Sequence, residues 1–187
     1  MPGSTLHSVG YRNAYKTQWR KTLGNKAVTD QSRIRLTALL APIIFAVHVT
    51  EEAPGFVGWF NSLVPRGITQ SLFLSVNATG FIITIILAGI LAATQGRVVA
   101  TLMLGWLGFL MLTNAVFHLV ATVVHDRYCP GVVTATILYL PYFAWFFWVA
   151  VRHLRVRVLV AVVAMLAGSV PMAIHGYLIV FRGDRLF

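Results

Sequence analysis

The pentapeptide HVTEE, residues 48–52, places one imidazole and two carboxylates within a single helical turn. His48, Glu51 and Glu52 stand at positions i, i+3 and i+4, which share one face of an α-helix. Imidazole and carboxylate are ligands that suit zinc, iron or manganese. A buried carboxylate beside an imidazole can also transfer protons without a metal. Both kinds of chemistry need partners from elsewhere in the chain.

The segment TNAVFHLVATVVHD, residues 113–126, supplies such partners. Asn114, His118 and His125 follow one another at i, i+4 and i+11 and share a helical face. His175 lies four residues after Pro171, a residue that leaves a helix carbonyl without its usual backbone donor. We therefore expect these groups to converge with the HVTEE turn.

The composition indicates that the converging elements are membrane helices. The chain has 187 residues, of which 58% are hydrophobic and 11% are charged, and its mean hydropathy is +0.77. A soluble domain carries about a quarter charged residues. The net charge of +10 lies in the gaps between apolar runs, which indicates topology signals and phospholipid contacts and argues against nucleic acid as a partner. The single cysteine, Cys129, excludes an internal disulfide and a cysteine-rich metal site.

The apolar runs predict an all-α polytopic membrane bundle of about five transmembrane helices. A basic segment, residues 1–35, precedes a membrane domain, residues 36–187. The first helix is the shortest and contains Pro42, so it spans the bilayer only if it continues through HVTEE; otherwise it is re-entrant or partly buried. The predicted helices cover residues 36–52, 68–93, 98–125, 132–151 and 156–181.

The distribution of Lys and Arg predicts a cytoplasmic N-terminus. In this orientation His48, the Glu pair, His118, His125 and His175 share the outer leaflet. Ionisable groups in a bilayer almost always face the bundle interior, so we expect a polar pocket there. The predicted metal ligands are His48, Glu51, Glu52 and His118, with His125 and His175 as further ligands, and the predicted catalytic residues are Glu51, Glu52, Asn114 and His118.

Structural roles remain open for several of these residues. His125 can be a solvated or capping residue, and His175 a hydrogen-bonded core histidine. Asn77 is expected to support the site or to hydrogen-bond within the bundle. The aromatic run YLPYFAWFFWVAV is typical of lipid contacts, and the glycines of GWLG indicate close helix packing.

Three motifs in this order resemble those of the HXXEE domain family of small bacterial membrane proteins. They are HVTEE, then NAVFH with Asn114 and His118, then YCPGVVT with Tyr128 and Thr134. The resemblance runs from the first helix to the start of the fourth and implies that Tyr128 and Thr134 support the site. It also implies a bacterial cytoplasmic membrane, in which the outer side predicted from the Lys and Arg residues is the periplasmic side. The resemblance indicates which residues form the site, but it does not indicate which reaction they carry out.

Three functions fit this pattern. The first is a membrane enzyme that uses a divalent transition metal to hydrolyse, hydroxylate or desaturate a lipid-like or isoprenoid substrate. The second is a metal-free isomerase or cyclase that transfers protons through the Glu and His residues. The third is a proton- or metal-coupled carrier or binding protein. Few polar residues lie in the inner halves of the helices, which favours a pocket over a through-path, and the expected partners are membrane lipids and an apolar small molecule.

Overall fold

The computed structural model describes the backbone of residues 5–186 and the side chains of residues 28–186. The side chains of most of the predicted basic segment thus lie outside the described residues. All regular structure in the described range is helical, as predicted. The elements are α1 (Thr5–Glu52), α2 (Phe56–Asn61), α3 (Gln70–Thr94), α4 (Arg97–Leu107), η1 (Gly108–Thr113), α5 (Asn114–Val124), α6 (Val132–Thr134), η2 (Ala135–Tyr139), α7 (Leu140–Arg152), α8 (Val158–Tyr177) and η3 (Leu178–Arg182).

Five of the described stretches are long and apolar enough to cross a bilayer, which confirms the predicted membrane bundle. The last four begin and end within two residues of the predicted bounds. The five spans are Val28–Glu52, Gln70–Thr94, Arg97–Val124, Val132–Arg152 and Val158–Arg182.

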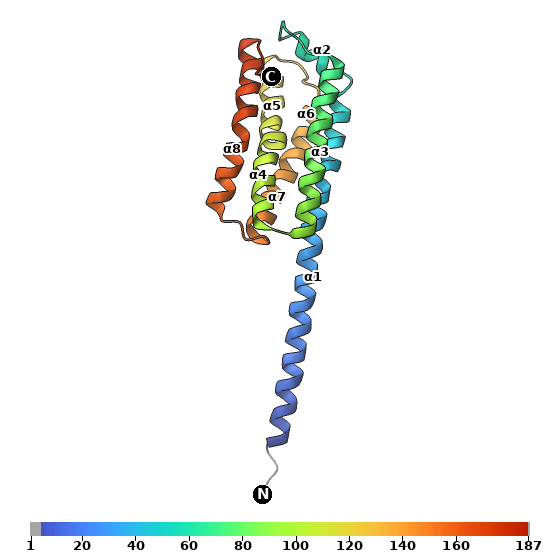
Figure 1. Cartoon of the computed structure of the whole chain (residues 1–187). Coiled ribbons are helices and arrows are strands. Elements are labelled where there is room, and N and C mark those ends of the chain that lie inside the picture. Colours follow the sequence, from blue (N-terminus) through green and yellow to red (C-terminus); the bar gives the residue numbers. More distant parts are fainter. Residues whose placement is uncertain (1–4, 187) are drawn as a thin grey trace.

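The first helix differs from its prediction because it begins at Thr5 and not at residue 36. The polar residues that precede the apolar run contain no proline after Pro2, so no residue type stops the helix there. Its apolar part, Val28–Glu52, is long enough to span the bilayer, so the re-entrant alternative is not needed. In Figure 1 this helix extends well beyond the other helices of the bundle.

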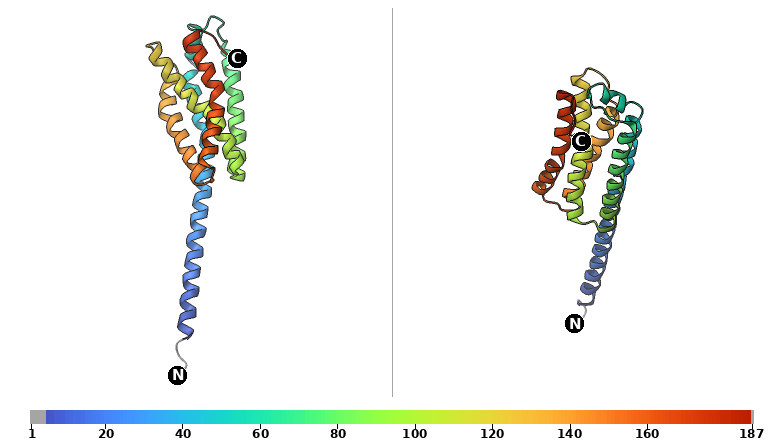
Figure 2. Two further views of the ribbon diagram at one scale, coloured as in Figure 1. Left: turned by 90° about the vertical axis from the view of Figure 1, so that its left-hand side faces the viewer. Right: turned by 45° about the horizontal axis from the view of Figure 1, so that its top comes forward.

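The helices pack as two groups. α3 packs along α1, whereas α8 packs along α4 and η1, as Figures 1 and 2 show. The second contact is close because small residues face each other: a Cβ on Gly168 would lie 1.9 Å from the carbonyl oxygen of Gly105. Such glycine contacts let membrane helices approach by van der Waals packing. The close packing expected of GWLG is therefore present.

Polar side chains gather at the end of the bundle where α1 reaches Glu52, which we call the HVTEE end. The interior toward the opposite end is mainly apolar and includes Leu107, Met111 and Phe146. At that opposite end His153 lies 3.3 Å from Asp30 and 3.2 Å from the Arg33 guanidinium, which links α7 to α1.

Candidate metal centre and adjoining cavity

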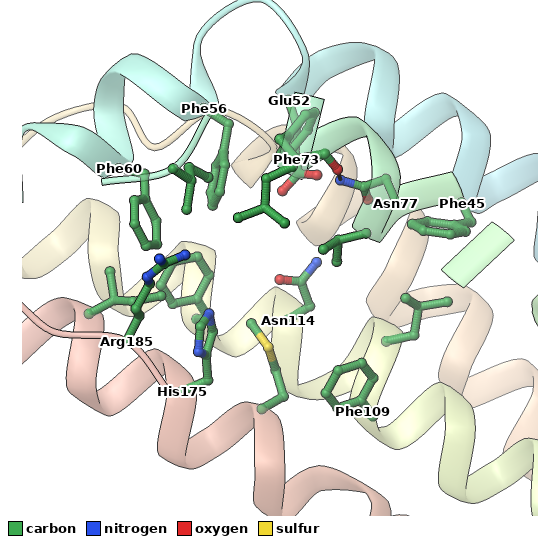
Figure 3. Close-up of a pocket in the computed structure, with 17 residues that line it drawn as sticks. Phe45, Glu52, Phe56, Phe60, Phe73, Asn77, Phe109, Asn114, His175 and Arg185 are labelled. Atoms are coloured by element: carbon green, nitrogen blue, oxygen red, sulfur yellow. Dashed lines mark hydrogen bonds between the residues drawn. The ribbon is translucent and has the colours of Figure 1, made fainter. Parts of the chain in front are cut away.

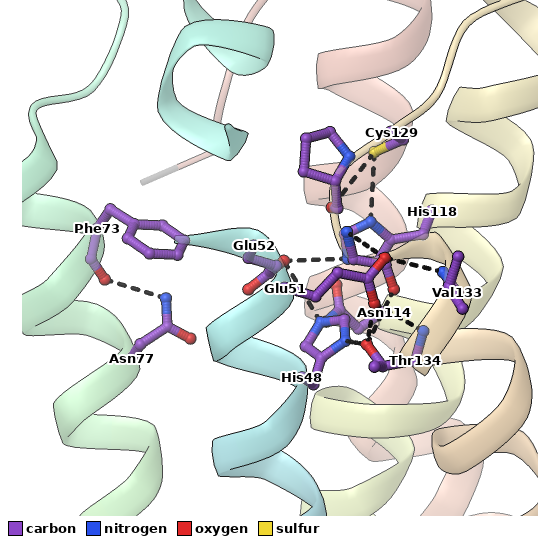
Figure 4. A network of polar contacts seen from close by, with 12 residues as sticks. His48, Glu51, Glu52, Phe73, Asn77, Asn114, His118, Cys129, Val133 and Thr134 are labelled. Atoms are coloured by element: carbon purple, nitrogen blue, oxygen red, sulfur yellow. Dashed lines mark hydrogen bonds and ion pairs between the residues drawn. The ribbon is translucent and has the colours of Figure 1, made fainter. Parts of the chain in front are cut away.

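Three side chains from α1 and α5 meet at the HVTEE end. Nε2 of His118 lies 3.1 Å from Oε1 of Glu52, and Nε2 of His48 lies 3.4 Å from the same oxygen. The ligand atoms of the three residues lie within 4.8 Å of one another. Both imidazoles are fully buried, and Glu52 is 5% exposed. We call His48, Glu52 and His118 the triad (Figure 4).

The Nε2 atom of each imidazole faces Glu52, and the other ring nitrogen, Nδ1, has a partner that orients the ring. Nδ1 of His48 lies 2.8 Å from the Thr134 hydroxyl, and this hydroxyl donates to Glu51. The hydroxyl must therefore accept from His48, so Nδ1 carries the proton, and in the neutral ring Nε2 is an acceptor that lies 3.3 Å from the Asn114 amide nitrogen. Nδ1 of His118 lies 3.3 Å from the Cys129 sulfur, a weak acceptor, which favours the same tautomer.

The Nε2 atoms of both imidazoles and a carboxylate oxygen thus meet at one small volume. In this tautomer Nε2 of His118 has no donor to accept from among the described residues, because the atom it faces at 3.1 Å, Oε1 of Glu52, is itself an acceptor. A buried polar atom without a partner is costly, and a cation between the three groups would satisfy all of them. Two imidazoles and one carboxylate are a ligand set that holds zinc or iron with coordination positions left open. The residues present therefore fit a divalent transition metal.

Irregular helical turns flank the triad. The π-helical segment η1 ends at Thr113, directly before Asn114, and η2 begins directly after Thr134. A π-helical turn contains an extra residue and changes the direction of the side chains that follow, and such turns are frequent at functional sites. Nδ2 of Asn114 lies 3.3 Å from Nε2 of His48, so the amide borders the same volume.

Glu51, the other carboxylate of the motif, does not belong to the triad and binds the turn before the fourth span. Its two oxygens accept hydrogen bonds from the backbone N–H groups of Gly131, Val133 and Thr134 at 3.2, 3.1 and 2.7 Å. They also accept from the hydroxyls of Thr134 and Tyr128, both at 2.5 Å. An anion at a helix N-terminus is stabilised by the helix dipole, so Glu51 caps the fourth span.

The bond to Glu51 also changes the acidity of Tyr128, which lies outside the spans. It raises the pKa of the Tyr128 phenol to about 12 from an ordinary value of 10, because the protonated phenol is the hydrogen-bond donor. Burial raises the pKa of the neighbouring Cys129 thiol, which keeps its sulfur neutral beside His118.

Gly131 brings the turn into contact with the triad. It adopts a left-handed backbone conformation with φ +101°. A Cβ at this position would lie 2.7 Å from Cε1 of His118 and 2.9 Å from both Cγ of Glu52 and Cε1 of His48. Real side chains do not fit at such distances, so the close approach requires glycine.

Aromatic rings enclose the triad on its other sides. The Tyr139 ring lies 4.2 Å from the His48 ring, and the Phe117 ring lies 5.1 Å from that of His118. Phe56 of α2 approaches His118 from the loop that follows the motif. The Tyr139 hydroxyl is buried without a hydrogen-bond partner among the described residues. Sequence reasoning missed Tyr139, Cys129 and Gly131, although the last two stand in the YCPGVVT motif.

The triad borders a cavity of about 170 Å³ through Glu52, and the neighbouring Asn114 lines the same cavity. Figure 3 shows its walls, which are mostly aromatic and aliphatic, with side chains from α1, α2, α3, η1, α5 and α8. Leu72 and Val76 line it on α3 and are 41% and 53% exposed, so the cavity reaches the lateral surface of the bundle. We call it the apolar cavity.

Three further predicted site residues, Asn77, His125 and His175, do not belong to the triad either. Asn77 lines the apolar cavity and donates to the Phe73 carbonyl of its own helix at 3.0 Å. His175 lines the cavity on α8, and its Nδ1 accepts the backbone N–H of Leu186 at 3.2 Å. His125 packs its ring 6.2 Å from that of Trp59 at the end of α5. Among the described residues the group with metal-ligand geometry is His48, Glu52 and His118.

Comparison with known proteins places these motifs in one family. A family model described as "Protein of unknown function with HXXEE motif" matches residues 39–146, from the middle of α1 into α7. No curated protein and no solved structure matches the chain. The matched segment contains the whole triad and the turn that Glu51 binds, and it covers more than half of the chain. The chain therefore belongs to the HXXEE family.

Proposed function

We propose that this protein is a membrane-embedded metalloenzyme that acts on a lipid-like substrate held in the apolar cavity. The observation that carries the proposal is the convergence of the Nε2 atoms of His48 and His118 with a Glu52 oxygen at one buried point that borders an apolar cavity. His48, Glu52 and His118 would hold zinc, iron or manganese. The metal would supply a Lewis acid or a site for water or O₂ at its open positions.

The surrounding residues have distinct roles in this proposal. Thr134 and Cys129 orient the imidazoles through their Nδ1 atoms. Asn114 borders both His48 and the cavity, so its amide is placed to bind a substrate oxygen or a water molecule. Glu51 positions the turn and takes no part in the reaction. The aromatic walls exclude water and bind the apolar part of the substrate.

The apolar interior beyond the triad favours an enzyme over a carrier. Between Tyr139 and the opposite end of the bundle, the large buried side chains that the structure describes are mainly apolar, and they form no polar path for ions. We also propose that the HVTEE end faces the periplasm of a bacterial cytoplasmic membrane. Lys and Arg residues concentrate at the other end, which is typical of the cytoplasmic side.

Product analysis tests the proposal. Protein loaded with zinc, iron or manganese is incubated with a bacterial lipid extract in aerated buffer that contains a chemical reductant, and the lipids are compared by mass spectrometry with those from Glu52→Gln protein. We expect a lipid that gains oxygen, loses hydrogen or is hydrolysed only with the loaded protein that retains Glu52. Exposed Asp126→Asn provides a matched control that keeps activity.

Two results would contradict the metalloenzyme. Glu52→Gln protein that forms the same product would show that the triad is not the reaction centre. Chelated protein that turns over at the same rate as loaded protein would instead favour the metal-free isomerase or cyclase, in which Glu52 and His118 would add one proton to the substrate and remove another from it.

A further inference from the structure

A second hollow adjoins the apolar cavity at the surface of the HVTEE end. It has a volume of about 420 Å³ and is lined by Asn61 at the end of α2 and by the loop between α2 and α3, which contributes the polar residues Arg66 and Thr69. Arg185, which follows η3, completes it. We call it the polar hollow.

The two spaces share part of their walls. Ile68, Leu72 and Arg185 line both the polar hollow and the apolar cavity. In Figure 3, Arg185 lies beside His175, across the cavity from Glu52. A molecule that fills both spaces would therefore have a polar group near two guanidinium groups and an apolar part that reaches toward the triad.

The position of Arg185 is fixed by the backbone around it. Gly183 has φ +62° and turns the chain after η3, and a Cβ there would lie 3.0 Å from the Leu63 carbonyl oxygen. The Asp184 N–H then donates to the Leu178 carbonyl at 3.1 Å, and the Leu186 N–H donates to Nδ1 of His175 at 3.2 Å. His175 is in this respect a positioning residue for the segment that carries Arg185.

The charges of the polar hollow are not balanced by protein carboxylates among the described residues. Among the described residues, ion pairs join His48 and His118 to Glu52, and His153 to Asp30. Neither Arg66 nor Arg185 belongs to one of these ion pairs. The adjacent Asp184 carboxylate accepts the backbone N–H of Arg185 at 2.9 Å. Basic residues are also less frequent on the translocated side of a membrane. The presence of two arginines in the polar hollow is therefore a reason to expect an anionic ligand there.

We propose that the substrate is an amphiphile whose phosphate headgroup binds Arg66 and Arg185 in the polar hollow, with its chain in the apolar cavity. This inference rests on the proposed function and names the substrate class of the same site. Two guanidinium groups match the charge of a phosphate and bind its oxygens through paired N–H donors. The exposed Leu72 and Val76 leave a lateral opening through which a chain passes from the bilayer.

Direct binding to metal-free protein in a neutral detergent tests this proposal. The probes are oleoyl lysophosphatidic acid and mono-oleoylglycerol, which share one chain and differ in charge. We expect the phosphate probe to bind more tightly, and Arg185→Gln or Arg66→Gln to weaken it about tenfold or more. Arg182→Gln, which changes an exposed arginine of η3 that lines neither space, should leave binding unchanged.

A second pair of variants tests the chain-binding part. Val76→Trp fills the cavity wall and should weaken the phosphate probe, whereas Ile86→Trp should not. Both residues lie on α3 with similar exposure, 53% and 52%, and Ile86 lines neither space. Unchanged thermal unfolding of each variant confirms that the fold is kept.

Equal affinity for both probes would overturn the proposal, as would equal loss in Arg182→Gln and Arg185→Gln. Failure of the proposed function looks different, because binding is measured without metal and without turnover. Phosphate-dependent binding with no lipid product would leave the headgroup site standing and remove the enzyme. A metal-dependent product from neutral lipid that Arg185→Gln does not affect would support the enzyme and remove the headgroup site.

Discussion

Glu51 and Glu52 are adjacent in the chain, yet their carboxylates serve different parts of the molecule. Glu52 has one oxygen 3.1 Å from Nε2 of His118 and 3.4 Å from Nε2 of His48. Glu51 accepts five hydrogen bonds from the turn that precedes the fourth span. The motif therefore pairs a candidate metal ligand with an anchor for the turn that covers it.

Because Glu51 holds the turn in place, we expect Glu51→Gln to lower the stability of the protein. The amide keeps the shape of the side chain but loses the charge that its five donors share. Hydrogen bonds to charged groups contribute about 1.5–3 kcal/mol, and we expect a loss of free energy of unfolding of that size. Thermal or denaturant unfolding in detergent measures it, with exposed Asp126→Asn as the control. An unchanged stability would show that the turn does not depend on Glu51.

Gly131→Ala should disrupt the triad itself. The added methyl group would lie within 3 Å of all three triad side chains, and the left-handed conformation disfavours alanine. We expect loss of metal binding together with lower stability. Gly89→Ala is the matched control, because a Cβ at Gly89 meets nothing within 4 Å. Stoichiometric metal in Gly131→Ala protein would mean that the turn does not approach the triad as described.

Thr134→Val should lower the affinity for the metal, although it removes none of the three metal ligands. The hydroxyl fixes the His48 tautomer by accepting from Nδ1 at 2.8 Å, and valine has the same shape without it. Loss of such a partner costs about 10–100-fold in metal affinity. Competition with a chelator measures this change. Thr136→Val provides the control, since the Thr136 hydroxyl bonds only the Val132 carbonyl of its own helix. Equal affinities in the two variants would contradict the orienting role.

Tyr128 should make stability depend on pH in alkaline solution. Its phenol pKa is about 12 in the folded protein and 10 ordinarily, so between these values the folded state retains a proton that the unfolded state loses. Stability contributed by this proton is complete below pH 10 and falls as the pH rises toward 12. Unfolding of wild-type and Tyr128→Phe protein across this range checks it, and the variant should lack this part of the decline. Parallel curves would exclude the linkage.

Much of the fold and of the site follows from sequence patterns. Apolar runs and Pro or Gly breakers locate the spans, because each span must satisfy its backbone internally. Helical spacing also places His48 with the Glu pair, and Asn114 with His118, on single faces. Because the bundle interior is where polar faces gather, the approach of His118 to the motif follows from depth and face alone.

The remaining features depend on tertiary contacts. Residues 51 and 52 differ by about 100° around a helix, and only the approach of the turn at Gly131 decides which of them meets the histidines. The π-helical turns beside Asn114 and Thr134 have no simple sequence signal, and they change the direction of the side chains around them. His175 and His125 share the depth of the triad, but they lie on other faces, toward Leu186 and Trp59.

Metal content per chain is the measurement that most directly tests the division of labour between the two carboxylates. Purified protein is loaded, desalted and analysed by mass spectrometry for zinc, iron and manganese. The wild type and Glu51→Gln should retain roughly one ion per chain, as should His153→Ala at the opposite end of the bundle, whereas Glu52→Gln, His48→Ala and His118→Ala should lose it. Retention by Glu52→Gln, or a wild type that binds no ion in stoichiometric amount, would contradict the account.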